Sequence, residues 1–547
     1  MNRALFRLCI FSIVFLSTIP FSSVVSAQDK IAFKTRPYED GVEISGLEGR
    51  VGKALVVPEK IGGLPVRRIG NSAFHESAAL ESVVLPESLK TIGESAFSCC
   101  RSLESVEFPK ELQAIGAYAF HECTSLTDVA LPANLQTLGE SVFSGCSSLA
   151  RFEFPDGLTS TGIRTFEECY SLTSVRLPRE LKTIEDFAFY DCPALASLEL
   201  PKKLQTIGNW SFCGCRALKS VVFPSELKSI GSYAFTSCQF LKDVVFSEGL
   251  NSIEGYAFSG CESLVSVDLP TGLQTVGNSA FWKCKSLRSV KLPEGLESIG
   301  VETFKDCDLD VVRLPSTLEE IGGGWNCERF EISEEHPRLC LIDGVLFNKE
   351  ATILLAYPGK KAGERYVVPE GVEKIGDSAF QDCKTLKSVE LPQGLKTIGN
   401  QAFRECRSLQ RVDIPAGLQT LDKMAFCKCD SLEKVVLPKG LKTIGEGAFI
   451  DCWSLESVAL PEGLQGIGIC AFFGCGRLEG VKLPAGLQTL GAQAFQKCNS
   501  LRSVELPESL QEIGYAAFPE GVKFSAPKGS WAEQWIEKRR QHAGAFM

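Results

Sequence analysis

The chain is poor in the residue types on which several classes of function depend. Only four histidines, His75, His121, His336 and His542, occur among 547 residues, and they are isolated from one another. This leaves little room for histidine-based catalysis or zinc chemistry. The 57 Lys and Arg residues form no basic cluster, and 67 Asp and Glu residues give a formal net charge of −10. Because nucleic-acid binding needs a positive stripe to meet phosphates, we expect no nucleic-acid partner.

Recognisable catalytic motifs are also missing. The chain has no nucleophile elbow, no His-Glu-x-x-His and no phosphate-binding loop, and Gly322-Gly323-Gly324 lacks the Lys and Ser or Thr of such a loop. We therefore expect no enzymatic activity, no cofactor and no metal site. An enzyme would need a site that no motif reveals, inside the interruption of the repeats described below.

Long apolar runs are confined to the N-terminus. Arg3 and Arg7 precede an apolar stretch over Leu8–Leu16, and Val25-Ser26-Ala27 offers small residues before Gln28. This order is typical of a secretory signal peptide, predicted over residues 1–27. No later stretch approaches 18 uninterrupted apolar residues, so the mature chain should contain no transmembrane segment. We expect a secreted or cell-surface protein, or a periplasmic one if the source is a Gram-negative bacterium.

What the chain has in abundance is one repeat of 23 residues. Prolines mark it in two blocks, with Ser247 at the one exceptional position. The first block has Pro86, Pro109, Pro132, Pro155, Pro178, Pro201, Pro224, Pro270 and Pro293, and the second has Pro369, Pro392, Pro415, Pro438, Pro461, Pro484 and Pro507. A fixed period of this length indicates stacked supersecondary units rather than separate globular domains.

The repeat reads L-P-x-x-L-x-x-I-G-x-x-A-F-x-x-C-x-x-L-x-x-V-x. Leu103 to Phe108 alternates like a short strand that proline ends. Leu112 to Gly116 suggests a second extended edge, and Ala119 to Cys123 a helical or irregular turn. One phenylalanine per repeat should form a stacked apolar core of about 18 coils in a rod about 85 Å long: Phe74, Phe97, Phe120, Phe143, Phe166, Phe189, Phe212, Phe235, Phe258, Phe281 and Phe304, then Phe380, Phe403, Phe426, Phe449, Phe472, Phe495 and Phe518.

This repeat resembles that of the BspA-like, or treponemal-type, leucine-rich repeat family, over roughly residues 35–530. Two flanking features strengthen the resemblance. They are a longer first repeat with Val42–Gly46, Val57-Pro58 and Ile69-Gly70, and an irregular insert with His336-Pro337, Asp343-Gly344 and Tyr357-Pro358. The resemblance implies a leucine-rich-repeat solenoid of the α/β type. It also implies an exported protein that adheres to host proteins or to other cells.

The sequence predicts six segments. They are a signal peptide (1–27), an N-terminal β cap (28–57), a first repeat block (58–315), an irregular insert (316–368), a second block (369–524) and a C-terminal helical cap (525–547). The insert should hold a β-meander with a turn at Asp343-Gly344, serving as a joint between the blocks or as a binding knob. Ser530 to Glu533 forms a capping box, and Trp531 and Trp535 should share the helix face that covers the last coil.

Sixteen of the 23 cysteines also repeat at 23 residues: Cys100, Cys123, Cys146, Cys169, Cys192, Cys215, Cys238, Cys261, Cys284, Cys307, Cys383, Cys406, Cys429, Cys452, Cys475 and Cys498. We interpret them as small buried hydrophobes. Disulfides between adjacent coils and a metal ladder are the alternatives, although parallel side chains suit neither. Among the others, Cys327 and Cys340 in the insert are candidates for a disulfide.

A solenoid binds through its strand face, where outward side chains of successive coils form rows. The candidate binding residues lie between the Val and the Leu-Pro of each repeat: Glu107, Glu153, Arg176, Glu199, Asp268, Lys291, Glu390, Asp413, Lys482 and Glu505. Two residues earlier, most repeats carry serine. A flat face of small and mixed-charge side chains favours a broad contact with another protein, although a merely solvated face explains it as well. We expect an adhesin that binds extracellular or cell-surface proteins; the alternative is a structural spacer of the envelope or secreted layer without a specific ligand.

Overall fold

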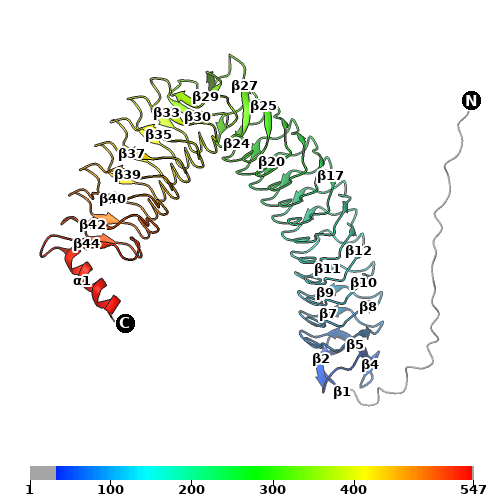
Figure 1. The fold of residues 1–547 in the computed structure, drawn as a ribbon. Coiled ribbons are helices and arrows are strands. Elements are labelled where there is room, and N and C mark those ends of the chain that lie inside the picture. Colours follow the sequence, from blue (N-terminus) through cyan, green and yellow to red (C-terminus); the bar gives the residue numbers. More distant parts are fainter. Residues whose placement is uncertain (1–31, 545–547) are drawn as a thin grey trace, which may run out of the picture.

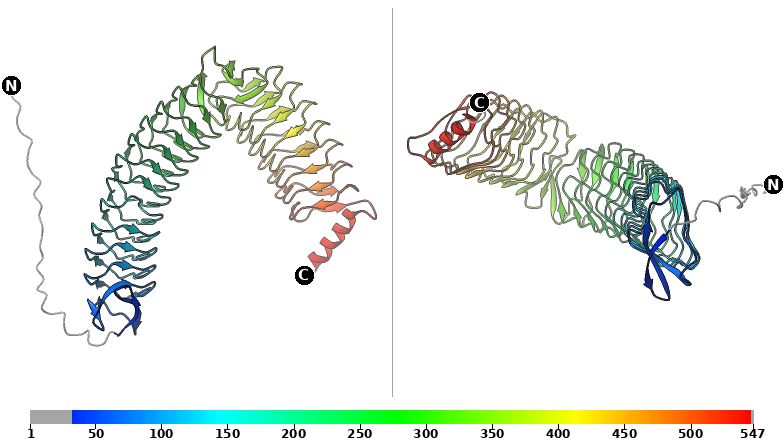
Figure 2. Two further views of the ribbon diagram at one scale, coloured as in Figure 1. Left: turned by 180° about the vertical axis from the view of Figure 1, so that it is seen from behind. Right: turned by 90° about the horizontal axis from the view of Figure 1, so that it is seen from below.

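The computed structural model describes residues 32–544, and the predicted signal peptide lies outside the described residues. The chain forms a repeat solenoid whose coils stack into an arch (Figure 1). The N-terminal strands lie at one foot of the arch and the C-terminal helix at the other, and the view from behind shows the same two arms (Figure 2). None of the described helices is long and apolar enough to cross a membrane.

Most coils contribute one strand to each of two parallel ladders. The first ladder uses the segment before Leu-Pro. Its middle residue, such as Val83 or Val106, is buried while both neighbours are exposed, as the alternation of side chains in a strand requires. Its strands are β3 (Ala54–Val56), β6 (Ser82–Val84), β8 (Ser105–Glu107), β10 (Asp128–Ala130), β12 (Arg151–Glu153), β13 (Ser174–Arg176), β15 (Ser197–Leu198), β17 (Ser220–Val222), β19 (Asp243–Val245), β21 (Ser266–Asp268), β23 (Ser289–Lys291), β25 (Leu309–Arg313), β27 (Cys327–Glu331), β31 (Arg365–Val367), β33 (Ser388–Glu390), β35 (Arg411–Asp413), β37 (Lys434–Val436), β39 (Ser457–Ala459), β42 (Ser503–Glu505) and β44 (Lys523–Ser525).

The second ladder uses the short segment before the repeat glycine. Its strands are β5 (Leu64–Ile69), β7 (Thr91–Ile92), β9 (Ala114–Ile115), β11 (Thr137–Leu138), β14 (Thr183–Ile184), β16 (Thr206–Ile207), β18 (Ser229–Ile230), β20 (Ser252–Ile253), β22 (Thr275–Val276), β24 (Ser298–Ile299), β26 (Glu320–Ile321), β30 (Ile353–Ala356), β32 (Lys374–Ile375), β34 (Thr397–Ile398), β36 (Thr420–Leu421), β38 (Thr443–Ile444), β40 (Gly466–Ile467), β41 (Thr489–Leu490) and β43 (Glu512–Ile513). A Cβ at Gly116 would lie 2.7 Å from the backbone nitrogen of Glu94 in the preceding coil. Glycine is therefore needed there because adjacent coils approach closely.

The segment that carries the core Phe and Cys is a run of turns rather than a helix. Ser95 and Cys99, on either side of Phe97, have φ angles of 53° and 61°. Left-handed residues at this spacing interrupt a right-handed helix. The expected α/β character is therefore corrected to coils of strands and turns, and α1 (Trp531–Gly544) is the one α-helix among residues 32–544.

The predicted phenylalanine core is confirmed, because the rings of successive coils stack. Phe212, Phe235 and Phe258 are fully buried, with ring centroids 5.1 and 5.3 Å apart and planes within 12° of parallel. Two residues that the sequence analysis missed extend the stack at the insert. Trp325 lies 5.1 Å from Phe304, and Tyr357 lies 5.1 Å from Phe380.

The repeated cysteines are buried, as predicted, and they have a further role. All sixteen are free and buried. In fifteen of them the thiol donates a hydrogen bond of 2.9–3.3 Å to the carbonyl of the Phe 26 residues earlier. The thiols thus satisfy buried carbonyls between coils, which apolar side chains of similar size could not do.

These thiols should resist alkylation in the folded chain. Burial raises the pKa of Cys146 to about 12, and the thiolate is the reactive form. With iodoacetamide at about pH 8, we expect Cys99, Cys340 and Cys470, which are only partly buried, to react well before the repeated cysteines. Peptide mass spectrometry measures this order, and the same reaction in concentrated guanidinium chloride should erase it. Equal labelling rates for the partly buried and the repeated cysteines in the folded chain would contradict the burial of the repeated thiols.

Each end of the solenoid carries a different element. At the N-terminal end, β1 (Ala32–Tyr38) and β2 (Gly41–Glu48) form an antiparallel hairpin. Strand β2 also pairs in parallel with β5 and so joins the hairpin to the second ladder. The short β4 (Lys60–Ile61) pairs with β5. At the other end, Ser530 accepts a hydrogen bond from the amide of Glu533 (3.1 Å). Trp535 packs edge-on against Phe524 at 5.5 Å, whereas Trp531 is exposed, so the two tryptophans do not cover the last coil together.

The insert forms a partition between two hydrophobic cores. Strands β28 (Leu339–Ile342), β29 (Val345–Asn348) and β30 make an antiparallel meander at the position where the sequence predicts one. Along β29, Leu346 packs into the first core, while Val345 and Phe347 pack into the second. The arch bends at these strands (Figure 1). The parallel ladders also run further than the predicted limits of 316 and 368, through β27 on one side and from β30 and β31 on the other.

A buried charge network joins the two arms at this bend. The Lys305 side chain is 4% exposed, and its Nζ lies 3.8 Å from carboxylate oxygens of both Glu302 and Glu405. Glu302 also accepts hydrogen bonds from Gln381 (2.6 Å) and Arg404 (3.3 Å) of the second arm. Burial alone would raise the pKa of Glu405, but the Lys305 and Arg404 charges lower it overall. We call Glu302, Lys305, Gln381, Arg404 and Glu405 the elbow network.

The disulfide suggested for Cys327 and Cys340 is corrected by the structure, in which both thiols are free. Cys327 belongs to the first core, whereas Cys340 packs against the second. Cys340 donates instead to the carbonyl of Asn348 across the hairpin, at 3.2 Å. Because the meander separates the two cores, the two side chains are directed into different environments.

Candidate binding face

The candidate binding residues form rows along the outward side of the first ladder, which we call the outer face. The register places Glu153 opposite Arg176, Asp268 opposite Lys291, and Glu390 opposite Asp413. Glu107 lies next to Ala130, and Glu505 ends β42 beside Ser525. Glu199 directly follows β15. Lys482 lies outside any strand, because its coil keeps only the single bridge between Ser457 and Gly480.

Some of these charges are paired and others are not. Arg176 pairs with Glu153 at 3.2 Å, Asp413 accepts from Arg411 at 2.9 Å, and Glu390 pairs with Arg365. Exposed pairs of this kind contribute little to stability. In the part of the chain that the structure describes, the other side chains make no ion pair; these are Glu107, Glu199, Asp268, Lys291, Lys482 and Glu505.

Exposed valines interrupt the charged rows. Val222 and Val245 lie opposite each other on β17 and β19, with exposed fractions of 64% and 54%. Val84, Val367 and Val436 occupy equivalent strand-end positions and are also exposed. A central apolar pair within a charged surround has the composition of a protein–protein contact.

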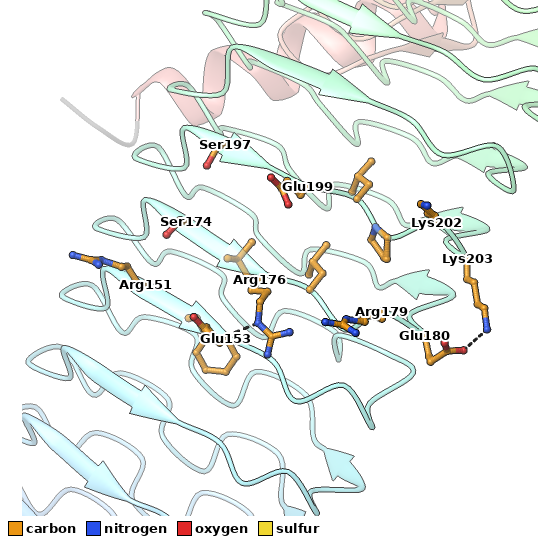
Figure 3. A pocket seen from close by; sticks show the side chains of 15 residues that line it. Arg151, Glu153, Ser174, Arg176, Arg179, Glu180, Ser197, Glu199, Lys202 and Lys203 are labelled. Atoms are coloured by element: carbon orange, nitrogen blue, oxygen red, sulfur yellow. Dashed lines mark hydrogen bonds and ion pairs between the residues drawn. The ribbon is translucent and has the colours of Figure 1, made fainter. Parts of the chain in front are cut away.

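The outer face is not flat, which corrects the prediction. A hollow of about 730 Å³ opens across β12, β13 and β15, lined by residues from Arg151 to Lys203 (Figure 3). An adjoining hollow of about 610 Å³ covers β10 and β12. The two share Arg151, Phe152, Glu153 and Arg176 and so form one trough, which we call the outer trough.

Arg176 is the best-fixed side chain in the outer trough. Its guanidinium donates to Glu153 (3.2 Å), Asp156 (3.3 Å) and the carbonyl of Phe154 (3.1 Å). It is therefore held across the trough between two coils. Four other basic residues line the trough and were missed, since they lie outside the row considered in the sequence: Arg151 at a strand start, and Arg179, Lys202 and Lys203 after the prolines.

A stacked row of aromatic side chains lies on the turn segments, outside the outer face. Phe187, Trp210, Tyr233 and Tyr256 have centroids 6.0, 4.0 and 4.6 Å apart and nearly parallel planes, and the Arg164 guanidinium lies 4.1 Å from the Phe187 ring centroid. Each lies two residues before a core Phe, a 23-residue spacing that could have revealed the row. Because the rings cover each other's faces, the row offers no open platform for a ligand and instead packs the coils together.

The stacked coils, the two parallel ladders and the Leu and Phe core define a leucine-rich-repeat solenoid. The chain matches the BspA-type leucine-rich repeat region, described with six copies, over residues 64–162, 136–238, 211–328, 360–479 and 465–526. These segments cover well over half of the chain. The protein therefore belongs to the BspA-type leucine-rich repeat family.

Several solved structures are similar to this chain. The Treponema pallidum leucine-rich repeat protein TpLRR is 38% identical, over 34% of this chain and 87% of its own, with a TM-score of 0.33. A leucine-rich repeat protein from Bacteroides ovatus is 22% identical over 92% and 99%, with a TM-score of 0.32. The pneumococcal vaccine antigen PcpA is 18% identical over 92% and 93%, with a TM-score of 0.40. No curated protein matches the chain significantly.

Proposed function

We propose that this protein is exported and binds other proteins through its outer face, as an adhesin toward host matrix or other cells. The observation that carries the proposal is the in-register alignment of outward side chains from successive coils, as in Glu153 with Arg176 and Asp268 with Lys291. Such rows give a long accessible surface with apolar and charged parts. Export rests on the predicted signal peptide, and adhesion on the resemblance to the family.

Charge reversal on the outer face should weaken binding to a partner. We expect the chain lacking residues 1–27 to bind one or more immobilised extracellular matrix proteins saturably. Glu107→Lys, Asp268→Lys and Glu505→Lys together, at three exposed and unpaired positions of the outer face, should reduce the affinity tenfold or more, which corresponds to about 1.4 kcal/mol. Surface plasmon resonance measures both effects.

The matched control carries the same change of charge on the insert. Glu334, Glu335 and Glu350 are exposed there, and their replacement by lysine should leave the affinity within twofold. Deletion of the insert is unsuitable, because Trp325, Leu346 and Phe347 belong to the cores. Loss of binding only in the control variant would move the binding site to the insert. Absence of saturable binding to any matrix or cell-surface protein would favour the structural spacer.

A further inference from the structure

We infer that the outer trough is the part of the outer face that receives the partner, and that it takes an extended protein segment in which carboxylates alternate with apolar side chains. The inference rests on the proposed function and specifies the place and the chemistry of the contact. It is carried by the shape, the charge and the unpaired cations of the trough.

The shape favours an elongated ligand. The outer trough extends over β10, β12, β13 and β15, since its two adjoining hollows share Arg151 and Arg176. Phe152 and Val175 are among the residues that line the outer trough, and their side chains are buried in the core. The packing of the core therefore fixes the floor of the trough. An open trough over four coils suits an extended segment better than a compact small molecule, which needs an enclosing pocket.

The charge favours an acidic ligand. Arg151, Arg176, Arg179, Lys202 and Lys203 line the larger hollow together with three carboxylates. The adjoining hollow adds Asp128 and Asp156 and no further cation, so the positive surplus is confined to the larger hollow, where we expect the carboxylates of the ligand to bind. Arg151 lies at one end of the larger hollow and Lys202 and Lys203 at the other, with Arg176 between them (Figure 3). This surplus of positive charge would attract carboxylates by steering and by direct pairing.

Two of these cations have no partner of their own. Arg179 and Lys203 are engaged with Asp156 (3.7 Å) and Glu180 (2.5 Å). The side chains of Arg151 and Lys202, both exposed, make no ion pair or hydrogen bond within the described residues. They can therefore bind a ligand without first losing an internal contact, and they are the residues on which the inference depends most.

The spacing of the cations sets the spacing of the acidic groups. With a rise of about 3.3 Å per strand residue and about 4.8 Å between coils, the Cα atoms of Arg151 and Arg176 are about 8 Å apart, and Lys202 lies further along, in the turn after β15. In an extended segment the first separation corresponds to carboxylates two to three residues apart, with a third carboxylate further along for Lys202.

A polypeptide fits the outer trough better than a densely charged polyanion such as a sulfated glycan. Glu153 and Glu199 lie among the cations (Figure 3) and would repel a ligand with a negative charge on every unit. Just beyond β15, Val222 and Val245 offer exposed apolar surface, which gains from contact with apolar side chains. Alternating carboxylate and apolar residues satisfy both features.

The test uses a fluorescein-labelled octapeptide with glutamate at residues 2, 4 and 7 and leucine at residues 3 and 5, measured by fluorescence anisotropy on the chain lacking residues 1–27. We expect binding that weakens with added salt and at least tenfold weaker binding of the peptide with glutamine in place of glutamate. Arg151→Glu combined with Lys202→Glu should weaken binding of the acidic peptide at least tenfold. The matched control, Lys434→Glu with Lys439→Glu, reverses two exposed lysines of the second arm at the repeat positions that Arg151 and Lys202 occupy, and should change binding of the acidic peptide less than twofold.

Unchanged binding of the acidic peptide to the Arg151→Glu/Lys202→Glu variant would overturn the inference, as would no binding to the unaltered chain. If dextran sulfate binds through Arg151 and Lys202 and the acidic peptide does not, the choice of a polypeptide as the ligand would be overturned. Circular dichroism confirms folding of each variant. Saturable binding of a matrix protein that is weakened by the Glu107, Asp268 and Glu505 reversals, with no binding of the peptide, would defeat this inference alone. Absence of any saturable protein binding would defeat the proposed function.

Discussion

Replacement of Phe235 by alanine is expected to lower the free energy of unfolding by about 3–5 kcal/mol, the usual cost of removing a large buried side chain. Phe235 is fully buried, its ring stacks between Phe212 and Phe258, and Phe223 contacts it edge-on at 5.7 Å. The coils above and below are held in register by hydrogen bonds and cannot close the cavity freely, so the loss should lie at the upper part of this range.

The loss should also be local in the first arm. In a solenoid each repeat contacts only its neighbours, so hydrogen exchange measured by mass spectrometry should accelerate in residues 205–270 and much less beyond the elbow. Val222→Ala, at an exposed position in the same part of the chain, is the control and should change stability by less than about 0.5 kcal/mol. A Phe235→Ala variant as stable as this control would contradict a continuous stacked core.

Replacement of Lys305 by methionine is expected to destabilise the elbow by about 3–5 kcal/mol, the range for removing one partner of a buried ion pair. The change leaves the carboxylates of Glu302 and Glu405, only 14% and 16% exposed, without a cation that lies within 3.8 Å of both. Arg404 compensates only in part, since its Nη1 is 3.3 Å from Glu302 and its Nη2 is 3.1 Å from Glu405. Because these residues come from both arms, the two arms should separate more readily.

Hydrogen exchange in residues 300–330 and 375–410 measures this effect, along with denaturant unfolding. Lys396→Met is the matched control, because Lys396 pairs with Glu373 at 2.9 Å and both side chains are about half exposed, at 53% and 52%. Its loss should change stability by at most about 1 kcal/mol. If exchange at the elbow is as slow in Lys305→Met as in the control, the elbow network does not hold the arms together.

The periodic part of the fold could be predicted because each repeat position has one environment. A residue 23 positions after Phe97 must enter the same core, and so Phe120 and the buried thiol of Cys123 followed from spacing. The hydrogen-bond acceptor of the Cys123 thiol could not be predicted from the spacing. It is the carbonyl of Phe97, 26 residues earlier, which the thiol reaches only when the coils are stacked. The sequence left a helical and an irregular turn open at Ala119 to Cys123, because apolar spacing alone does not reveal a left-handed residue such as Ser95; the structure has the irregular turn.

The insert and the outer trough were harder to predict, for different reasons. Tyr357 lies 23 residues before Phe380 and continues the stack, but the surrounding repeat is too altered to recognise from its letters. Trp325 takes the same role after a shortened coil. The outer trough is lined by side chains that depart from the repeat: Arg151 occupies a row in which serine prevails, so the repeat pattern did not single it out.

Carboxylate footprinting of the bound complex tests most directly whether the outer face is where this protein meets its partner. Carbodiimide and glycine ethyl ester modify exposed carboxylates, and peptide mass spectrometry gives the rate at each residue. With a saturating matrix-protein partner we predict that Glu153, Glu199 and Asp268 become at least fivefold less reactive, while Glu334 and Glu335 on the insert keep their free rates. Protection of Glu334 and Glu335 with unchanged rates at Glu153, Glu199 and Asp268 would contradict binding through the outer face.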